Sequence, residues 1–335
     1  MFASVSIRKH FSKLFSLGLG IFLVIWLLSQ LDLADTFAII RDIPLSFLGL
    51  GAVCYVVSFA IRTLRFRMLL APDQQRSHLF PIVLVHYTAL TIIPARLGEL
   101  SYVYLLKKFN NVPTGHSLSS LLLARVFDHI AISTLFLCAS FFIDLQTQWL
   151  KTTSIFVGIG LVVSVLLLIA LLTYKEICVA WLRRVLETLR FDRYSLIRRV
   201  MHELDNIVSA LQGIHLKQHL GSIFGLSLMI WLCIFGVNYA LLQSFDVTLT
   251  YIEVAFASTF MILLGLIPLQ LLGGVGVRQT AWTFIALALG VSKNNAIVSA
   301  FGTHIASVMF LFVFGLYGLW RMWRLQTLHR EPAEG

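Results

Sequence analysis

Long apolar stretches separated by short polar segments make up most of this chain. Six of them are long enough for a helix to cross a bilayer, which needs about 20 residues. They lie near residues 14–31, 45–61, 115–143, 152–174, 219–242 and 296–320. The first follows a basic N-terminal segment and lacks a small-x-small cleavage site, which favours an uncleaved signal anchor over a cleaved signal peptide. The pattern predicts an all-α polytopic membrane protein with six transmembrane helices.

Two further apolar stretches, residues 79–106 and 251–291, are each interrupted near the middle. Because the six crossings already place both ends of each stretch on one side, we predict two re-entrant helical hairpins. In lipid, such breaks are tolerated only where the freed backbone is covered by protein or faces water. An ordinary pair of crossings at each position is the alternative, since it preserves the same topology. The predicted hairpin residues are Pro94, Gly98, Pro268, Gly273, Gly274 and Gly276.

The order crossing, hairpin, crossing occurs twice, over residues 45–143 and again over 219–320, with opposite orientation. This order is typical of an inverted-topology repeat. Between the halves, residues 175–217 alternate apolar and charged positions at helical spacing, which predicts a cytoplasmic amphipathic segment lying on the inner leaflet. We therefore expect residues 1–330 to form one transmembrane domain, with 331–335 as a tail.

Composition and charge support a membrane protein. Hydrophobic residues make up 58% of the chain and charged residues 13%, with a mean hydropathy of +0.86, which excludes an ordinary water-soluble domain. With a cytoplasmic N-terminus, 20 of the 26 Lys and Arg residues fall on the cytoplasmic side and three on the outer side, as the positive-inside rule requires. This predicts a multi-pass protein of the cytoplasmic (inner) membrane with both termini cytoplasmic, and it explains the net charge of +10 without a nucleic-acid partner.

Three basic residues are left inside apolar segments, and each has a polar neighbour. A charge at membrane depth costs several kcal/mol unless it faces protein or water. Arginine also binds phosphate through two parallel hydrogen bonds. We therefore predict a substrate-binding site for a phosphate-bearing lipid headgroup, formed by Arg96, Glu99, Arg125, Asp128, Arg278 and Gln279. The alternative is a set of internal salt bridges, since Arg96 with Glu99 and Arg125 with Asp128 are spaced i, i+3.

Arg62 and Arg65 follow the second predicted crossing and share one face of a helix. One interpretation is an anchor that contacts anionic headgroups at the inner surface. The other is a headgroup vestibule at the mouth of the first hairpin.

No motif for catalysis or for a cofactor is recognisable in the sequence. There is no phosphate-binding loop of the Walker type, no His-Glu-x-x-His pair and no Gly-x-Ser-x-Gly elbow, and the glycines at 273–276 lack a βαβ context. The ten histidines and four cysteines show no metal-ligand spacing. We expect no catalytic residue, no metal and no cofactor.

Three motifs resemble those of one known family: Pro94-Ala-Arg96-Leu-Gly98-Glu99, Arg125-Val-Phe-Asp128 and Gly273-Gly274-Val-Gly276-Val-Arg278. Because these motifs occur in the same order and at the same spacing, the chain resembles the transmembrane domain of bacterial lysylphosphatidylglycerol synthases, the flippase half of the multiple peptide resistance factor. The resemblance covers almost the whole chain. It implies an integral inner-membrane protein that translocates lipids, with aminoacylated phosphatidylglycerol as the best-known cargo.

Two positions depart from the family pattern. Ala124 stands where the family usually has Glu, and Gln279 stands where it tends to have Glu after the last arginine. The loss of two acidic groups weakens the expectation of a cationic lysyl headgroup. In two-domain synthases a cytosolic domain carries aminoacyl transfer, and the chain ends eleven residues after Arg324, so we expect that activity to be absent.

The leading hypothesis is a flippase-like lipid transporter and not an enzyme, with a membrane phospholipid or a lipid-linked substrate as its partner. Without a motif for ATP hydrolysis, movement must be downhill, proton-coupled or dependent on another protein. One alternative is a membrane-embedded transferase that uses a lipid-linked donor, with Glu99 or Asp128 as the base. Another is a non-transporting partner of an envelope lipid or glycan synthase.

Overall fold

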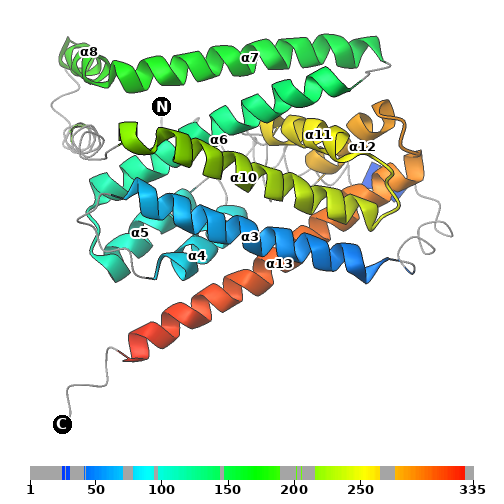
Figure 1. Ribbon diagram of the computed structural model, residues 1–335, viewed down its shortest axis with the longest axis horizontal. Helices are drawn as coiled ribbons and strands as arrows, with labels where there is room; N and C mark the ends of the chain where they lie inside the picture. Colours follow the sequence, from blue (N-terminus) through cyan, green and yellow to red (C-terminus); the bar gives the residue numbers. More distant parts are fainter. Residues whose placement is uncertain are drawn as a thin grey trace, which may run out of the picture.

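The computed structural model describes residues 25–26, 28–30, 41, 43–70, 78–93, 97–143, 147–188, 201, 205, 216–264 and 276–328. Within these ranges the regular structure is α-helical, without strands, and its elements are shown in Figure 1. They are α3 (Leu45–Leu69), α4 (Leu79–Ile92), α5 (Glu99–Asn110), α6 (Thr114–Phe142), α7 (Gln148–Thr173), α8 (Lys175–Thr188), α10 (Leu216–Gln243), α11 (Tyr251–Leu264), α12 (Val277–Ala288) and α13 (Lys293–Leu328). The predicted crossing at 14–31 falls almost wholly outside the described ranges.

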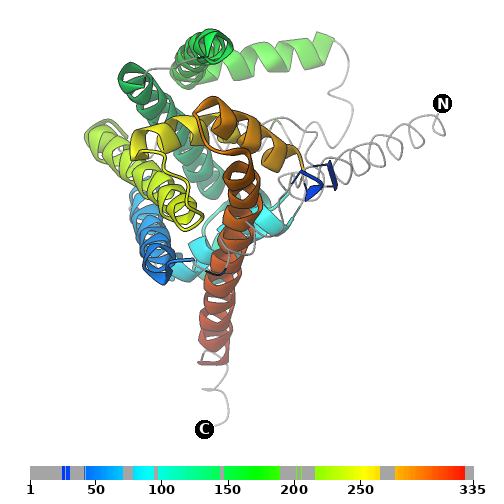
Figure 2. The same cartoon turned by 90° about the vertical axis from the view of Figure 1, so that its right-hand side faces the viewer.

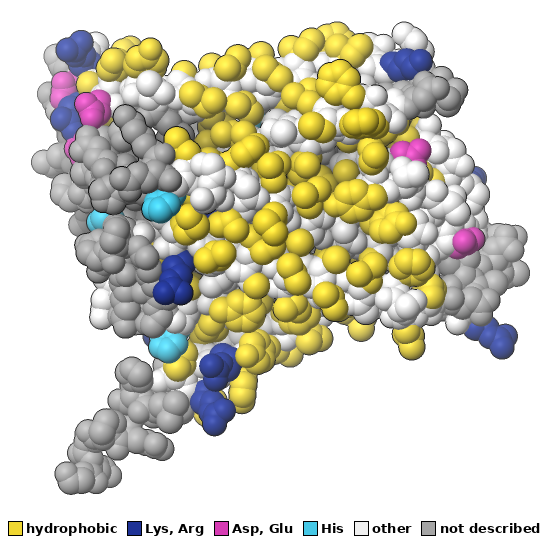
Figure 3. Space-filling view, in the orientation of Figure 1, with side chains coloured by type: hydrophobic (Ala, Val, Ile, Leu, Met, Phe, Trp, Pro, Cys, Tyr) yellow, Lys and Arg dark blue, Asp and Glu magenta, His cyan; other side chains and the backbone are white. Residues whose placement is uncertain are grey.

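Among the described helices, five are long and apolar enough to cross a membrane: α3, α6, α7, α10 and α13. They coincide with five of the six predicted crossings. Figure 3 shows the consequence on one face of the molecule, where apolar side chains form a broad band and charged side chains gather toward the ends of the helices. Apolar residues at these positions are expected where lipid tails surround the helices.

The two interrupted stretches form pairs of short helices. α4 and α5 have 14 and 12 residues, and α11 and α12 have 14 and 12. At 1.5 Å per residue each is about 18–21 Å long, which is too short to cross a hydrocarbon core of about 30 Å. The two members of each pair pack against each other. At the first break, a Cβ on Gly98 would collide with the backbone of Ala89 and Leu90, so glycine is what lets α5 begin this close to α4.

The helices from the two predicted halves pack into one body. α3 and α10 lie side by side and share the largest helix–helix contact among the described elements (Figure 1), and α6 packs on α10 and α11. α13 crosses α4 at Gly315, where a Cβ would collide with Thr88. Small residues at a crossing let helix backbones approach closely, as is common between membrane helices.

α7 and α8 lie at the edge of the molecule (Figures 1 and 2), with α7 packed on α6. Many apolar side chains of α7 are exposed, among them Phe156, Leu166 and Leu167. α8 begins the predicted amphipathic segment, and its Arg183 forms a half-exposed ion pair with Asp205 at 2.7 Å. Most of the remaining amphipathic segment lies outside the described residues.

Candidate functional site

A buried ion pair joins α3 to α6. Arg65 binds Asp128 through two contacts, Nη1 to Oδ1 at 2.5 Å and Nη2 to Oδ2 at 3.2 Å. The two side chains are 0% and 6% exposed. A charge left without its partner in such a place is strongly destabilising. The pair therefore fixes α3 to α6.

α10 completes the polar contacts of this pair. Trp231 Nε1 donates to Asp128 Oδ1 at 3.0 Å, and Arg65 Nη1 donates to Ser227 Oγ at 2.9 Å. Ser227 and Trp231 are four residues apart and so lie on one face of α10. Four side chains thus hold three helices together, and we call them the Arg65–Asp128 clamp.

A second ion pair is more open. Arg125, one turn before Asp128 on α6, has its Nη2 3.4 Å from Oε1 of Glu99, and the two side chains are 36% and 30% exposed. Glu99 is the first residue of α5, immediately after the first predicted hairpin turn. A longer, partly solvated ion pair contributes less free energy of stabilisation than a buried bidentate pair. The Arg125–Glu99 pair can therefore separate at a much lower cost than the clamp.

Arg62 is a third arginine in this region and is also buried. Its guanidinium carbon lies 4.1 Å from the centroid of the Tyr87 ring on α4, a cation–π contact. Among the residues that the structure describes, no carboxylate lies within ion-pair distance of Arg62. Among the described residues of this cluster, three arginines thus face two carboxylates, which leaves one surplus positive charge.

Several buried nitrogen atoms around this cluster have no hydrogen-bond partner within the described ranges. They are Arg65 Nε, Arg125 Nε and His86 Nε2. The Nδ1 atom of His86 lies 3.1 Å from Ser101 Oγ, and that hydroxyl donates to the carbonyl of Gly98 at 2.6 Å. Unpartnered buried N–H donors cost free energy, and Arg65 Nε and Arg125 Nε thus keep a hydrogen-bonding capacity that the described contacts leave unused.

The structure brings three of the predicted site residues together, Glu99, Arg125 and Asp128, but it pairs them differently from the salt-bridge alternative. Arg125 and Asp128 do not pair with each other. Asp128 binds Arg65, and Arg125 binds Glu99. Arg62 and Arg65, predicted at a headgroup vestibule or surface anchor, are instead buried at 6% and 0% exposure and face the other helices.

The second predicted break contributes a different arrangement. Gln279 is buried, and its Oε1 accepts a hydrogen bond from the Gly276 N–H at 2.8 Å, which caps the first turn of α12. Gly276 has φ +88°, a conformation that favours glycine. Arg278 is exposed in the first turn of α12 and forms no ion pair with the described carboxylates, whereas Asp128 is paired with Arg65.

The remaining predicted site and hairpin residues lie outside the described ranges. These are Pro94, Arg96, Pro268, Gly273 and Gly274. The convergence of the Arg96 and Arg278 guanidinium groups therefore stays a prediction.

Sequence reasoning missed the residues that complete the cluster. Ser227, Trp231, His86 and Tyr87 lie in apolar runs and were given no site role. One signal was present: Trp231 lies near the middle of a predicted crossing, whereas tryptophan on membrane helices is usually found near the interfaces. A mid-membrane indole N–H needs an acceptor, and here the acceptor is Asp128.

Together, the long apolar helices and the charges buried among them define a multi-pass, all-helical membrane protein. The chain belongs to the family described as the lysylphosphatidylglycerol synthase TM region, whose sequence profile matches residues 13–315. The resemblance expected from the three motifs is thereby confirmed.

The chain is similar to the glycosyltransferase AglD of Haloferax volcanii. It is 25% identical over 339 residues, a match that covers 90% of this chain and 53% of that protein. The chain thus spans about half the length of this curated relative. No solved structure matches the chain significantly.

Proposed function

We propose that this protein is a flippase-like transporter that moves a phosphate-bearing lipid headgroup across the membrane. The observation that carries the proposal is the surplus positive charge of the buried arginine cluster, together with its unpartnered N–H donors. Charges are costly at membrane depth and are found there mainly where they act on a substrate or an ion. A lipid phosphate can reach such a site while its acyl chains stay in the bilayer.

The residues of the cluster have different roles in this proposal. Arg62 and Arg125 bind the phosphate, because Arg62 has no carboxylate partner among the described residues and Arg125 has only the open contact to Glu99. Glu99 holds Arg125 until the substrate replaces it. The Arg65–Asp128 clamp remains closed, since opening it would leave a carboxylate without a partner in a region of low dielectric.

The membrane arrangement belongs to the same proposal. We infer six crossings, with the α4–α5 and α11–α12 pairs as re-entrant hairpins of an inverted repeat in the cytoplasmic membrane. The short lengths of these four helices support this assignment, as does the excess of basic residues on the predicted cytoplasmic side.

Reconstituted vesicles test the transport directly. A fluorescent phosphatidylglycerol is placed in both leaflets, and an impermeant reductant then bleaches the outer one, so that the slow phase reports exchange between leaflets. The wild type should speed exchange. Arg62→Gln and Arg125→Gln should each slow it by about tenfold to a hundredfold, the equivalent of one charge-assisted hydrogen bond of about 1.5–3 kcal/mol.

Arg183→Gln serves as the matched control, because Arg183 is in an ion pair on α8, remote from the cluster in sequence and half-exposed. It should leave the exchange rate unchanged. Exchange no faster than in protein-free vesicles, or equal rates for the wild type and Arg62→Gln, would contradict the proposal.

A second candidate function is glycosyl transfer from a lipid-linked donor, which the name of the Haloferax relative favours. Glu99 would take the proton of an acceptor hydroxyl, the hydroxyl oxygen would bond to the sugar carbon, and the lipid phosphate would leave as an anion bound by Arg62 and Arg125. Purified protein incubated with a radiolabelled lipid-phosphate sugar should then yield a labelled acceptor. If the donor remains unchanged while leaflet exchange proceeds, the result contradicts the transferase and supports the transporter.

A further inference from the structure

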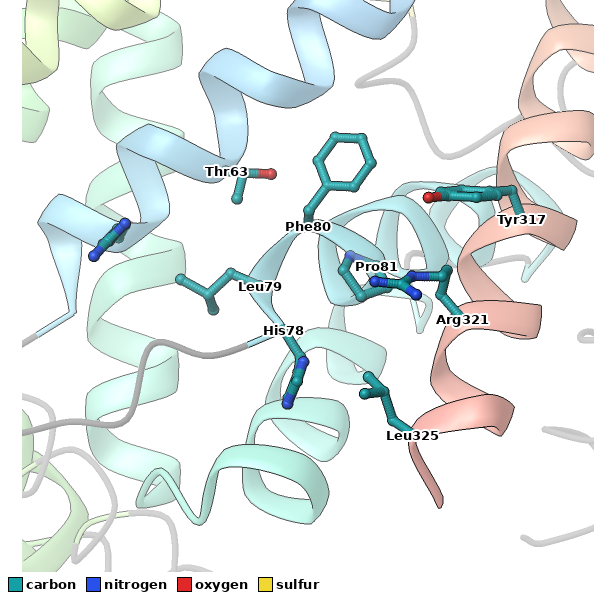
Figure 4. Close-up of a pocket in the computed structure, with 9 residues that line it drawn as sticks. Thr63, His78, Leu79, Phe80, Pro81, Tyr317, Arg321 and Leu325 are labelled. Carbon is teal, nitrogen blue, oxygen red and sulfur yellow. The ribbon is translucent and has the colours of Figure 1, made fainter. Parts of the chain in front are cut away.

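A pocket of about 350 Å³ lies between the C-terminal end of α3, the first turn of α4 and the C-terminal part of α13. Its polar lining comes from Thr63, Arg67, His78, Tyr317 and Arg321, and apolar side chains of α4 and α13 complete it. Figure 4 shows Arg321 extending from α13 toward Pro81 at the beginning of α4. The pocket thus joins parts of the chain that are about 250 residues apart.

The pocket is electropositive. Arg67 and Arg321 approach it from different helices, and none of the described residues that line it is acidic. α4 adds to this charge at its N-terminus, where no side chain caps the helix and the first intrahelical bond is made by the Ile82 N–H. The Leu79 and Phe80 N–H groups are therefore without an intrahelical partner and lie, with the positive end of the helix dipole, at the lining of the pocket, whereas Pro81 has no N–H. An anion at this place would gain from both.

The surroundings of the pocket suit a lipid. On α13, exposed apolar side chains lead away from the pocket toward the middle of the helix, and aromatic rings lie beside it, with Tyr317, Trp320 and Trp323 exposed at 45%, 48% and 62%. Tyrosine and tryptophan are typical of the headgroup level of a membrane. The volume is that of a small headgroup and too small for acyl chains, which would lie along α13.

This pocket is separate from the arginine cluster, although both use α3. Arg62 and Arg65 are buried against the other helices, whereas Thr63 and Arg67, four residues apart, belong to another face of α3, and the Arg67 side chain is exposed. Arg67 and Arg321 are both exposed, so the protein does not need them for its core.

We propose that this pocket binds the headgroup of an anionic phospholipid, with the phosphate at Arg321 beside the first turn of α4, Arg67 adding positive charge from α3, and the acyl chains along the exposed apolar face of α13. The site is independent of transport: it binds lipid whether or not the arginine cluster moves one. Positive charge from two helices, an apolar path that leads away from it and aromatic residues at its rim are together the features of a headgroup site at the edge of a bilayer.

Native mass spectrometry of the detergent-purified protein, titrated with phosphatidylglycerol, tests this site. The wild type should retain one tightly bound lipid. The double variant Arg67→Gln/Arg321→Gln should bind that lipid at least about tenfold more weakly, as expected for the loss of the charge-assisted contact to Arg321 and of the second positive charge at Arg67. Arg324→Gln is the matched control, because Arg324 is exposed on the same helix but does not line the pocket. Wild-type affinity in the double variant overturns the proposal.

Further arms identify the ligand and separate this site from transport. Phosphatidylcholine should bind more weakly than phosphatidylglycerol, and inorganic phosphate should not displace the bound lipid at millimolar concentration. Displacement by phosphate would overturn the lipid assignment in favour of a soluble anion.

Compared with the Gln substitution, Arg321→Lys should recover part of the lipid binding. Such a recovery would show that the Gln substitution acts through the lost charge and not through misfolding. Arg62→Gln should slow leaflet exchange by about tenfold to a hundredfold while this lipid stays bound, so failure of the proposed transport leaves the pocket proposal standing.

Discussion

At the scale of single residues, the Arg65–Asp128 clamp is the feature that sequence alone could predict only in part. The cost of charge at membrane depth correctly predicts that Asp128 points into the protein. It does not identify the partner, because the nearest cation in sequence, Arg125, is on the same helix, whereas Arg65 comes from a helix 63 residues away. Which cation reaches a buried carboxylate depends on how the helices pack.

Removing the carboxylate should destabilise the protein strongly. In Asp128→Ala, the Arg65 guanidinium remains buried, with Ser227 as its one remaining hydrogen-bond partner among the described residues, and the expected loss is about 3–5 kcal/mol of unfolding free energy. Replacing both members, as in Arg65→Met/Asp128→Leu, should recover most of this loss because no charge is left buried. Unfolding in detergent micelles with increasing SDS measures both effects.

Arg183→Gln provides the comparison for an exposed pair. Arg183 and Asp205 are about half exposed, so the variant should lose less than about 1 kcal/mol. A loss in Asp128→Ala as small as that of Arg183→Gln would show that Asp128 is not buried with Arg65.

At the scale of elements, hydropathy located the helices better than their ends. The crossing predicted at 219–242 corresponds to α10, Leu216–Gln243, but the one predicted at 45–61 continues to Leu69 as α3. The apolar pattern weakens at Arg62 and Arg65, although the helix does not end there. It continues because both arginines are buried and have partners on neighbouring helices.

The turn between α4 and α5 provides a test at this scale. Gly98→Ala places a methyl group against the Ala89 carbonyl, and the backbone must shift, which should cost about 1–3 kcal/mol, as overpacking usually does. Because Glu99 follows directly, the Arg125–Glu99 contact should also be disturbed and leaflet exchange should change. Gly160→Ala on α7, where a Cβ meets nothing within 4 Å, should be neutral or slightly stabilising. Equal stability of the two variants would mean that α5 does not approach α4 this closely.

At the scale of the whole molecule, the distribution of charge predicts an orientation that the helices make testable. α13 carries Lys293 at its start and Arg324 near its end, about 46 Å apart at 1.5 Å per residue, which is more than the thickness of a hydrocarbon core. The positive-inside rule places Arg324 in the cytoplasm and Lys293 outside. The repeat and the first crossing, by contrast, are predictions from hydropathy and the order of the apolar segments.

Cysteine labelling checks this orientation. In a background without the four native cysteines, Lys293→Cys should react with a membrane-impermeant maleimide in intact cells, and Arg324→Cys only after permeabilisation. Labelling of both from one side would show that α13 does not cross. The native cysteines to be replaced are Cys54, Cys138, Cys178 and Cys233.

The Arg65–Asp128 clamp also limits how this molecule can move. It joins α3 to α6 and, through Trp231, to α10. The first helices of the two predicted halves, α3 and α10, are therefore held together by these hydrogen bonds as well as by their packing. Separating these helices would leave the buried Asp128 carboxylate without a partner, which is strongly destabilising. In the transport that we propose, the parts that move would therefore be the short helices α4, α5, α11 and α12, while α3, α6 and α10 stay joined.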